Sequence, residues 1–153
     1  MRLRVAKSIA IDASAEQVWR VLTSPELTSQ WAVEFGASGP IESTWRLGSP
    51  VLWRNAQGEV YVFGRVTALE PGKLLAFTVC STQAEMRPTS GRDEDEIAQT
   101  YTLSSRGART VLTATHGDFA QLAGGEQIFP RVVELWDRLL PKIQELAEGI
   151  VSE

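Results

Sequence analysis

The chain has 153 residues, of which 43% are hydrophobic and 22% are charged, and its formal net charge at pH 7 is -4. This length predicts a single domain, residues 1–153, that can bury a core without disulfides or bound metal. The mild negative charge, with no basic run, argues against nucleic-acid binding, because binding to phosphates needs a positive surface.

The N-terminal part of the sequence predicts a strand followed by two short helices. Apolar residues alternate over 3–11, which is typical of a half-buried strand. Ser14, with Gln17 three residues later, forms a capping box, and the apolar residues that follow recur at helical spacing. Ser24 and Pro25 then predict a second helix, because serine caps helices and proline favours the first helical position.

The middle of the sequence predicts strands joined by short turns. Turn residues at 48–50, 55–58, 71–72 and 106–107 separate segments of alternating or continuous apolar character. Residues 81–96 lack any periodicity and include four consecutive acidic residues, which predicts a mobile loop. The predicted strands cover residues 43–47, 51–54, 59–70, 73–80, 97–104 and 110–116.

The C-terminal part predicts one long helix. Apolar residues recur at helical spacing from Ile128 to Ile150, after a flexible lead-in at Gly124 and Gly125. Pro141 lies inside this pattern and predicts a kink. Consecutive strands with short connections predict an antiparallel sheet, and the long helix has the apolar face to cover it. The predicted class is therefore α+β.

Four blocks of sequence resemble the START/Bet v 1-like (SRPBCC) superfamily, and within it they are most similar to the Hsp90-ATPase-activator homologue (AHSA1-like) group. The blocks are residues 11–19 (IDASAEQVW) with 22–26 and Trp31, residues 64–78 (GRVTALEPGKLLAFT), residues 99–103 with 107–119, and residues 136–146. The resemblance implies a helix-grip fold, with two short helices after strand 1. In this fold a curved antiparallel sheet of about six or seven strands wraps around the C-terminal helix.

The resemblance also implies an apolar cavity between the sheet and the helix. Many members bind lipids or aromatic molecules there, a few are cyclases or hydrolases, and some bind a chaperone. The candidate ligand-binding residues lie on predicted strands or on the long helix. They are Trp45, Trp53, Phe63, Arg65, Phe77, Tyr101, His116 and Trp136. Arg65 shares strand parity with Phe63 and is a candidate to hold a ligand carboxylate, whereas the alternative is exposure to solvent near the strand end. The alternative role of the aromatic residues is to fill the core.

His116 is the only histidine, and Asp118 follows two residues later. Such a pair can act as a general base, whereas the alternative is a hydrogen-bonded histidine at a strand end. Cys80 has no base near it in the sequence that would activate it as a nucleophile. One histidine, one cysteine and an acidic run without the spacing of a calcium loop predict no metal site, and no cofactor motif is present.

The predicted function is binding of a small hydrophobic or aromatic molecule in the cavity. The alternatives are a cyclase or hydrolase that uses His116 and Asp118, and a co-chaperone-like protein-binding module. The single cysteine and the absence of a signal peptide or an apolar span predict a soluble cytoplasmic protein. The sequence is compatible with a monomer and with a homodimer.

Overall fold

The described residues form a six-stranded antiparallel sheet with the order β1-β6-β5-β4-β3-β2. The computed structural model of the chain describes residues 3–81, 97–122 and 124–150, so that nearly all of the loop predicted at 81–96 lies outside the described residues. The strands are β1 (Val5–Ile11), β2 (Pro50–Arg54), β3 (Val60–Glu70), β4 (Leu74–Ser81), β5 (Ile97–Arg106) and β6 (Arg109–Gly117). The predicted α+β class and helix-grip architecture are confirmed.

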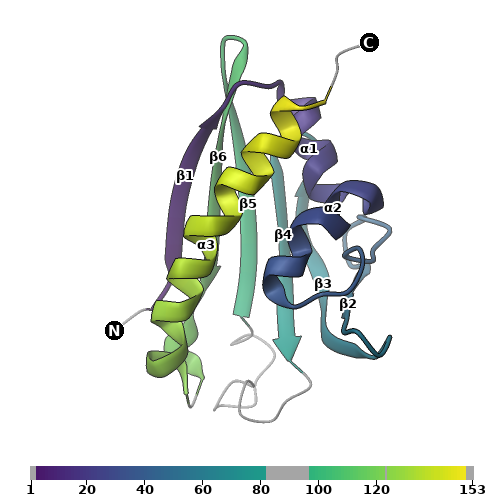
Figure 1. The fold of residues 1–153 in the computed structure, drawn as a ribbon, viewed down its shortest axis with the longest axis vertical. Helices are drawn as coiled ribbons and strands as arrows, with labels where there is room; N and C mark the ends of the chain where they lie inside the picture. Colours follow the sequence, from purple (N-terminus) through teal and green to yellow (C-terminus); the bar gives the residue numbers. More distant parts are fainter. Residues whose placement is uncertain (1–2, 82–96, 123, 151–153) are drawn as a thin grey trace.

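Two short helices follow β1, as the sequence predicts. In α1 (Ala15–Thr23) both hydrogen bonds of the Ser14–Gln17 capping box are present. Helix α2 (Pro25–Trp31) begins with proline at its first position, and Ser24 occupies the cap position without a side-chain hydrogen bond. A 3-10 turn, η1 (Ala32–Phe35), extends α2 toward the sheet. These elements lie beside the long helix on the same face of the sheet (Figure 1).

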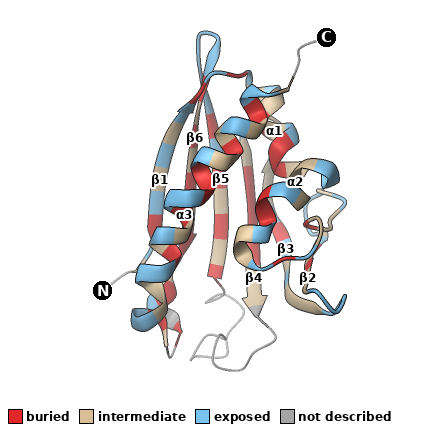
Figure 2. Ribbon diagram, viewed as in Figure 1, coloured by how far each residue is buried: buried red, intermediate tan, exposed pale blue. Residues whose placement is uncertain are grey.

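The long C-terminal helix α3 (Gly125–Glu148) crosses the face formed by β1, β6 and β5 (Figure 1). Its buried residues face the sheet and its exposed residues face outward (Figure 2). The helix continues through both Pro130 and Pro141. Ion pairs tie its outer side to the rest of the fold, since Asp137 pairs with Lys7 of β1 and Lys142 pairs with Glu34 of η1.

The strand predicted over residues 43–47 is wrong. Only an isolated bridge between Glu42 and Leu52 forms before β2. Trp45 has a φ of 54°, which lies in the left-handed region that extended strands do not use. The Trp45 indole N–H donates to the Thr23 carbonyl oxygen at 2.9 Å, which anchors the segment to the end of α1. A tertiary contact therefore determines a backbone that looks extended in the sequence.

The strand register brings one row of side chains to the same inner face of the sheet. Val5 pairs with His116, His116 with Gln99, Gln99 with Phe77, and Phe77 with Val66. Residues directly opposite each other on neighbouring strands point to the same face. This row therefore runs from the β1 edge of the sheet to β3, with one histidine and one glutamine among apolar neighbours.

Large aromatic side chains fill the middle of the interface between sheet and helices. Trp31 of α2, Tyr101 of β5 and Trp136 of α3 are each at most 1% exposed. The ring centroid of Tyr101 lies 6.5 Å from that of Trp31 and 6.0 Å from that of Trp136, within the usual range of aromatic pairs. The three rings join α2, β5 and α3 in one core.

Gly64 marks a close approach between β3 and β4, since a Cβ built there would lie 1.7 Å from the Thr78 carbonyl oxygen. Gly64→Ala is therefore expected to lower the free energy of unfolding by about 3 kcal/mol, because the strands must separate to admit the methyl group. Gly124→Ala is the matched control, since the nearest heavy atom lies at 4.0 Å. Equal urea midpoints for the two variants would contradict this role of Gly64.

Candidate functional site

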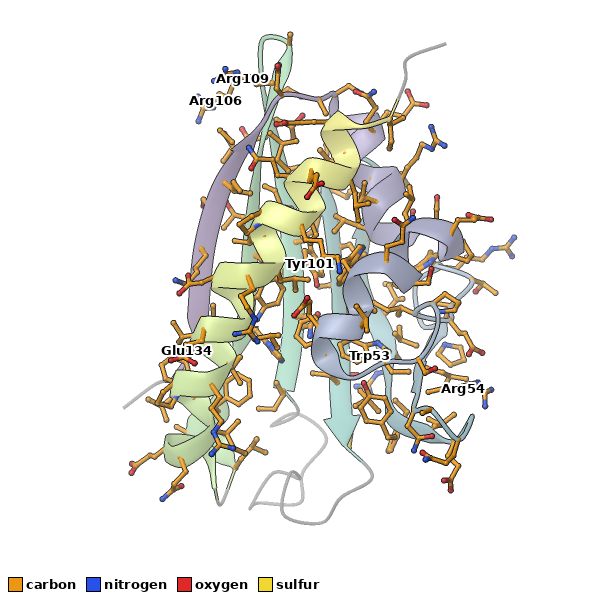
Figure 3. All side chains as sticks on the ribbon, viewed as in Figure 1. Trp53, Arg54, Tyr101, Arg106, Arg109 and Glu134 are labelled. Carbon is orange, nitrogen blue, oxygen red and sulfur yellow. The ribbon has the colours of Figure 1, made fainter. Side chains whose placement is uncertain are left out.

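A cavity of about 310 Å³ lies at one end of the interface between the sheet and α3. Its walls come from β2, the start of β3, the end of β4, the start of β5, the end of β6, residues 119–122, the first half of α3 and the turn η1. The lining residues are Phe35, Trp53, Tyr61, Val62, Val79, Ile97, Gln99, His116, Phe119, Leu122, Ile128, Val132 and Leu135. None of these lining residues, all of them from the described part of the chain, carries a permanent charge. The charged tip of the β5–β6 hairpin, with Arg106 and Arg109, lies at the opposite end of the sheet (Figure 3).

His116 reaches the cavity from β6 and is held by the long helix. The Trp136 indole N–H donates to His116 Nδ1 at 3.1 Å, and His116 is 8% exposed. Indole is only a donor, so Nδ1 must carry the lone pair, and the proton of the neutral ring is then on Nε2. Burial lowers the pKa of His116 to about 3, which keeps the ring neutral near pH 7. His116 therefore presents an Nε2–H donor.

Gln99 lies beside His116 in the strand register and is completely buried. The Tyr101 hydroxyl donates to Gln99 Oε1 at 2.8 Å, and burial raises the pKa of Tyr101, which keeps this hydroxyl protonated. Gln99 Oε1 is thus used as an acceptor. Gln99 Nε2 is buried and has no hydrogen-bond partner among the described residues.

Trp53 lines the cavity from β2 and, like Gln99, has a buried N–H group without a hydrogen-bond partner among the described residues. It is 3% exposed, and its Nε1–H lacks a hydrogen-bond partner in the part of the chain that the structure describes. The indoles of Trp31, Trp45 and Trp136 donate instead to Val21 O, Thr23 O and His116 Nδ1. Figure 3 places Trp53 close to η1. There its ring packs on Phe35 with centroids 5.0 Å apart.

Two of the eight predicted ligand-binding residues, Trp53 and His116, line the cavity. Tyr101 and Trp136 lie behind it and hold the polar liners by the hydrogen bonds to Gln99 and His116. Phe77 and Trp45 pack on each other, with ring centroids 5.9 Å apart, in the filled part of the core.

The structure places Phe63 and Arg65 away from the cavity. Both are exposed, and Phe63 pairs with Leu52 and Cys80 in the strand register, whereas the lining residue Val62 pairs with Trp53. Adjacent residues of a strand point to opposite faces, so Phe63 and Arg65 belong to the outer face of the sheet. The two residues share a face, as their common parity in the sequence predicts, and Arg65 takes the solvent-exposed position that was the alternative to a ligand-binding role.

The structure does not join His116 and Asp118 by a hydrogen bond. Asp118 Oδ1 accepts from the backbone N–H of Leu3 at 2.8 Å and of Ala120 at 3.0 Å, and so caps a 3-10 turn, η4 (Phe119–Gln121). The lone pair of the His116 ring is used by Trp136. A general base needs a free lone pair directed at the substrate proton, and in this arrangement the ring offers a donor instead.

Several lining residues had no place among the sequence candidates. Gln99 is the most informative, because Ile97, Gln99, Tyr101 and Leu103 form the buried face of β5 and only one of them is an amide. A polar residue among the apolar residues on one face of a strand indicates a functional position, and this pattern is visible in the sequence. Phe35, Phe119 and Leu122 lie on 3-10 turns or loops, where no periodicity reveals which side is buried.

Two further observations concern ions and membranes. Across residues 3–81, 97–122 and 124–150, no three His, Cys, Asp or Glu side chains gather closely enough to hold a metal ion. Within the same residues, no helix has the length and apolar character needed to cross a membrane.

Comparison with known proteins assigns the family. Residues 12–148 match the family described as Activator of Hsp90 ATPase homolog 1-like protein. The chain belongs to this family. Among curated proteins, none matches the sequence.

Solved structures share the fold of this family member at low sequence identity. Protein MLL2253 from Mesorhizobium loti has a TM-score of 0.76 and 19% identity, with 97% of this chain and 99% of that chain covered. The Aha1 dimer from Colwellia psychrerythraea has a TM-score of 0.72 and 18% identity, with 95% and 96% covered. CalU16 from Micromonospora echinospora has a TM-score of 0.67 and 18% identity, with 95% and 76% covered.

The buried neutral state of His116 predicts a specific loss of stability in acid. The pKa of His116 is about 3 in the folded chain and 6.5 when unfolded, so below pH 6.5 the unfolded state binds a proton that the folded state does not. The contribution of neutral His116 to the free energy of unfolding is complete above pH 6.5 and is lost as the pH falls toward 3. It amounts to about 2 kcal/mol between pH 7.5 and pH 5.

Urea denaturation at several pH values measures this effect. His116→Asn is the matched variant, because its amide oxygen can replace Nδ1 as the acceptor for Trp136 but does not titrate. The parent protein is expected to lose about 2 kcal/mol more than this variant over that interval. Parallel pH profiles of the two proteins would contradict a buried neutral His116.

Proposed function

We propose that this chain is a cytoplasmic protein that binds a small hydrophobic or aromatic molecule in the cavity between the sheet and α3. The observation that carries the proposal is the cavity itself, with about 310 Å³ of space and a predominantly apolar lining. Ligand sites are typically concave, mostly apolar and equipped with a few fixed polar groups. A core without a ligand would gain packing energy if larger side chains filled this space.

The distribution of aromatic residues supports the same proposal. Trp31, Phe77, Tyr101 and Trp136 fill the middle of the interface, so the space at its end is not a consequence of small side chains throughout. Phe35 contributes an aromatic wall, and its ring centroid lies 5.6 Å from Trp136 and 6.2 Å from His116. A planar apolar molecule would find ring faces and edges on several sides.

The fluorescence of N-phenyl-1-naphthylamine, an uncharged apolar dye, tests the proposal. The dye is expected to brighten on binding to the parent protein, and Val132→Phe should weaken its binding roughly tenfold or more by filling the cavity. Val132 is chosen because it lines the cavity from α3 and is 9% exposed.

Val133→Phe is the matched control, since Val133 is half-buried on the same helix and does not line the cavity. It should leave dye binding unchanged. Equal binding by the two variants, at equal thermal stability, would count against the cavity as the binding site. In that case a protein partner such as a chaperone becomes the better hypothesis for this family member.

A further inference from the structure

The outer face of the sheet, which points away from the helices, carries an uncharged area that spans four strands. In the strand register, Ser8 of β1 pairs with Thr113 of β6, Thr113 with Thr102 of β5, and Thr102 with Leu74 of β4. This row has the opposite parity to His116, so its side chains point outward. The outward row on each side of it holds only alanine, serine, threonine and valine. We call these three rows the uncharged face.

A sheet face in contact with water normally carries charged side chains. The uncharged face comprises eleven outward positions of the described strands, and a surface that is about 25–35% charged would place about three charges among them. The charges lie instead on the other side of the molecule, where Arg131, Glu134, Asp137 and Arg138 are exposed on α3. Figure 3 shows Glu134 on this outer side of the helix. The charge pattern therefore distinguishes the sheet face from the helix side.

Charged side chains of both signs border the uncharged face at the hairpin end of the sheet. Arg106 and Arg109 lie at the β5–β6 tip (Figure 3), Asp12 directly follows β1, and Glu70 ends β3. All four are exposed. A centre depleted in charge with a polar rim is typical of protein interfaces. Because this rim carries both signs, the same face of a second copy can meet it with opposite charges.

The size of the outer face suits a stable contact between two proteins. The six strands have 5–11 residues each, and a spacing of about 4.8 Å with a rise of about 3.4 Å per residue gives a face of about 800 Å². A stable complex of standard size buries about 800 Å² on each partner. Phe63 on β3 is 36% exposed and adds an aromatic ring to this face. Aromatic residues often supply much of the binding energy of an interface.

The two edges of the sheet are less suited to pairing with another chain than its face is. At the β1 edge, the Gln144 side chain of α3 donates to the Ala10 carbonyl oxygen at 3.0 Å. At the β2 edge, the backbones of Glu42 and Leu52 exchange two hydrogen bonds of 2.9 Å. Groups of the chain itself therefore occupy edge positions that an added strand would need.

We propose that the outer face of the sheet is the contact surface of a homodimer, in which two copies of this chain pack their uncharged faces together. Short side chains allow two sheets to pack about 10 Å apart. A two-fold axis brings the same residues together from both copies, so an uncharged centre avoids like-charge repulsion between chains of net charge -4. The cavity lies on the inner face of the sheet, so the inference does not depend on the proposed ligand binding.

Sedimentation equilibrium of the full chain tests the proposal. At about 100 μM we expect the parent protein to have twice the mass of one chain. Thr102→Lys and Ser8→Lys each place a lysine within the uncharged face, at positions that are exposed in the single chain and can accept a longer side chain there. Each variant should raise the dimer dissociation constant about 100-fold, because the two-fold axis buries an unpaired lysine from both copies.

Gln127→Lys is the matched control. Gln127 is exposed on α3, on the other side of the molecule, and its substitution changes the net charge by the same amount. It should leave the dimer dissociation constant unchanged. The far-ultraviolet circular dichroism spectra of the parent and the three variants should be the same, which verifies that each variant is folded.

Three results would overturn the proposal. A parent protein with the mass of one chain at this concentration is the result expected if a different partner covers the face. A dimer that both Thr102→Lys and Ser8→Lys leave unchanged must use another surface. Equal weakening by Gln127→Lys and the two strand variants would mean that net charge, rather than the outer face, controls association. The mass of the parent protein is decisive without any variant.

Discussion

The hydrogen bond from Trp136 to His116 is the contact on which the candidate site depends. It joins the middle of α3 to β6 inside the core, where both residues are buried. The indole can only donate, so the histidine must stay unprotonated at Nδ1 for the helix to dock with its polar group paired. The packing of α3 on the sheet therefore depends on a neutral His116. The same hydrogen bond places the remaining ring proton on Nε2.

The same helix interface divides the groove of the fold into a filled part and an open part. In the filled part, the ring centroids of Trp31, Phe77 and Trp136 lie 6.0–6.5 Å from the ring centroid of Tyr101. Beyond them, toward the ends of β4 and β6, side chains leave the cavity open. Tyr101 and Trp136 belong to the filled part, yet their polar atoms donate hydrogen bonds to Gln99 and His116, which line the open part. The core thereby fixes the chemistry of the cavity.

Most of the fold could be predicted from the sequence because its signals are local. The Ser14–Gln17 capping box and the turn at residues 71–72 involve neighbours in the chain, and both form. The 43–47 segment was mispredicted because a distant contact, Trp45 with Thr23, determines its backbone. For the site, alternation places Phe63 and Arg65 on one face of β3 but does not say which face is inner, and only the strand register decides that.

The most direct test of this account is the tautomer of the single histidine, read from its ring ¹⁵N shifts in a long-range ¹H–¹⁵N NMR spectrum at pH 5. We expect a neutral ring with the proton on Nε2, as the Trp136 hydrogen bond and a pKa of about 3 require. A protonated ring, or a neutral ring with the proton on Nδ1, would contradict the account. In either case Nδ1 would carry a proton and could not accept the hydrogen bond from Trp136.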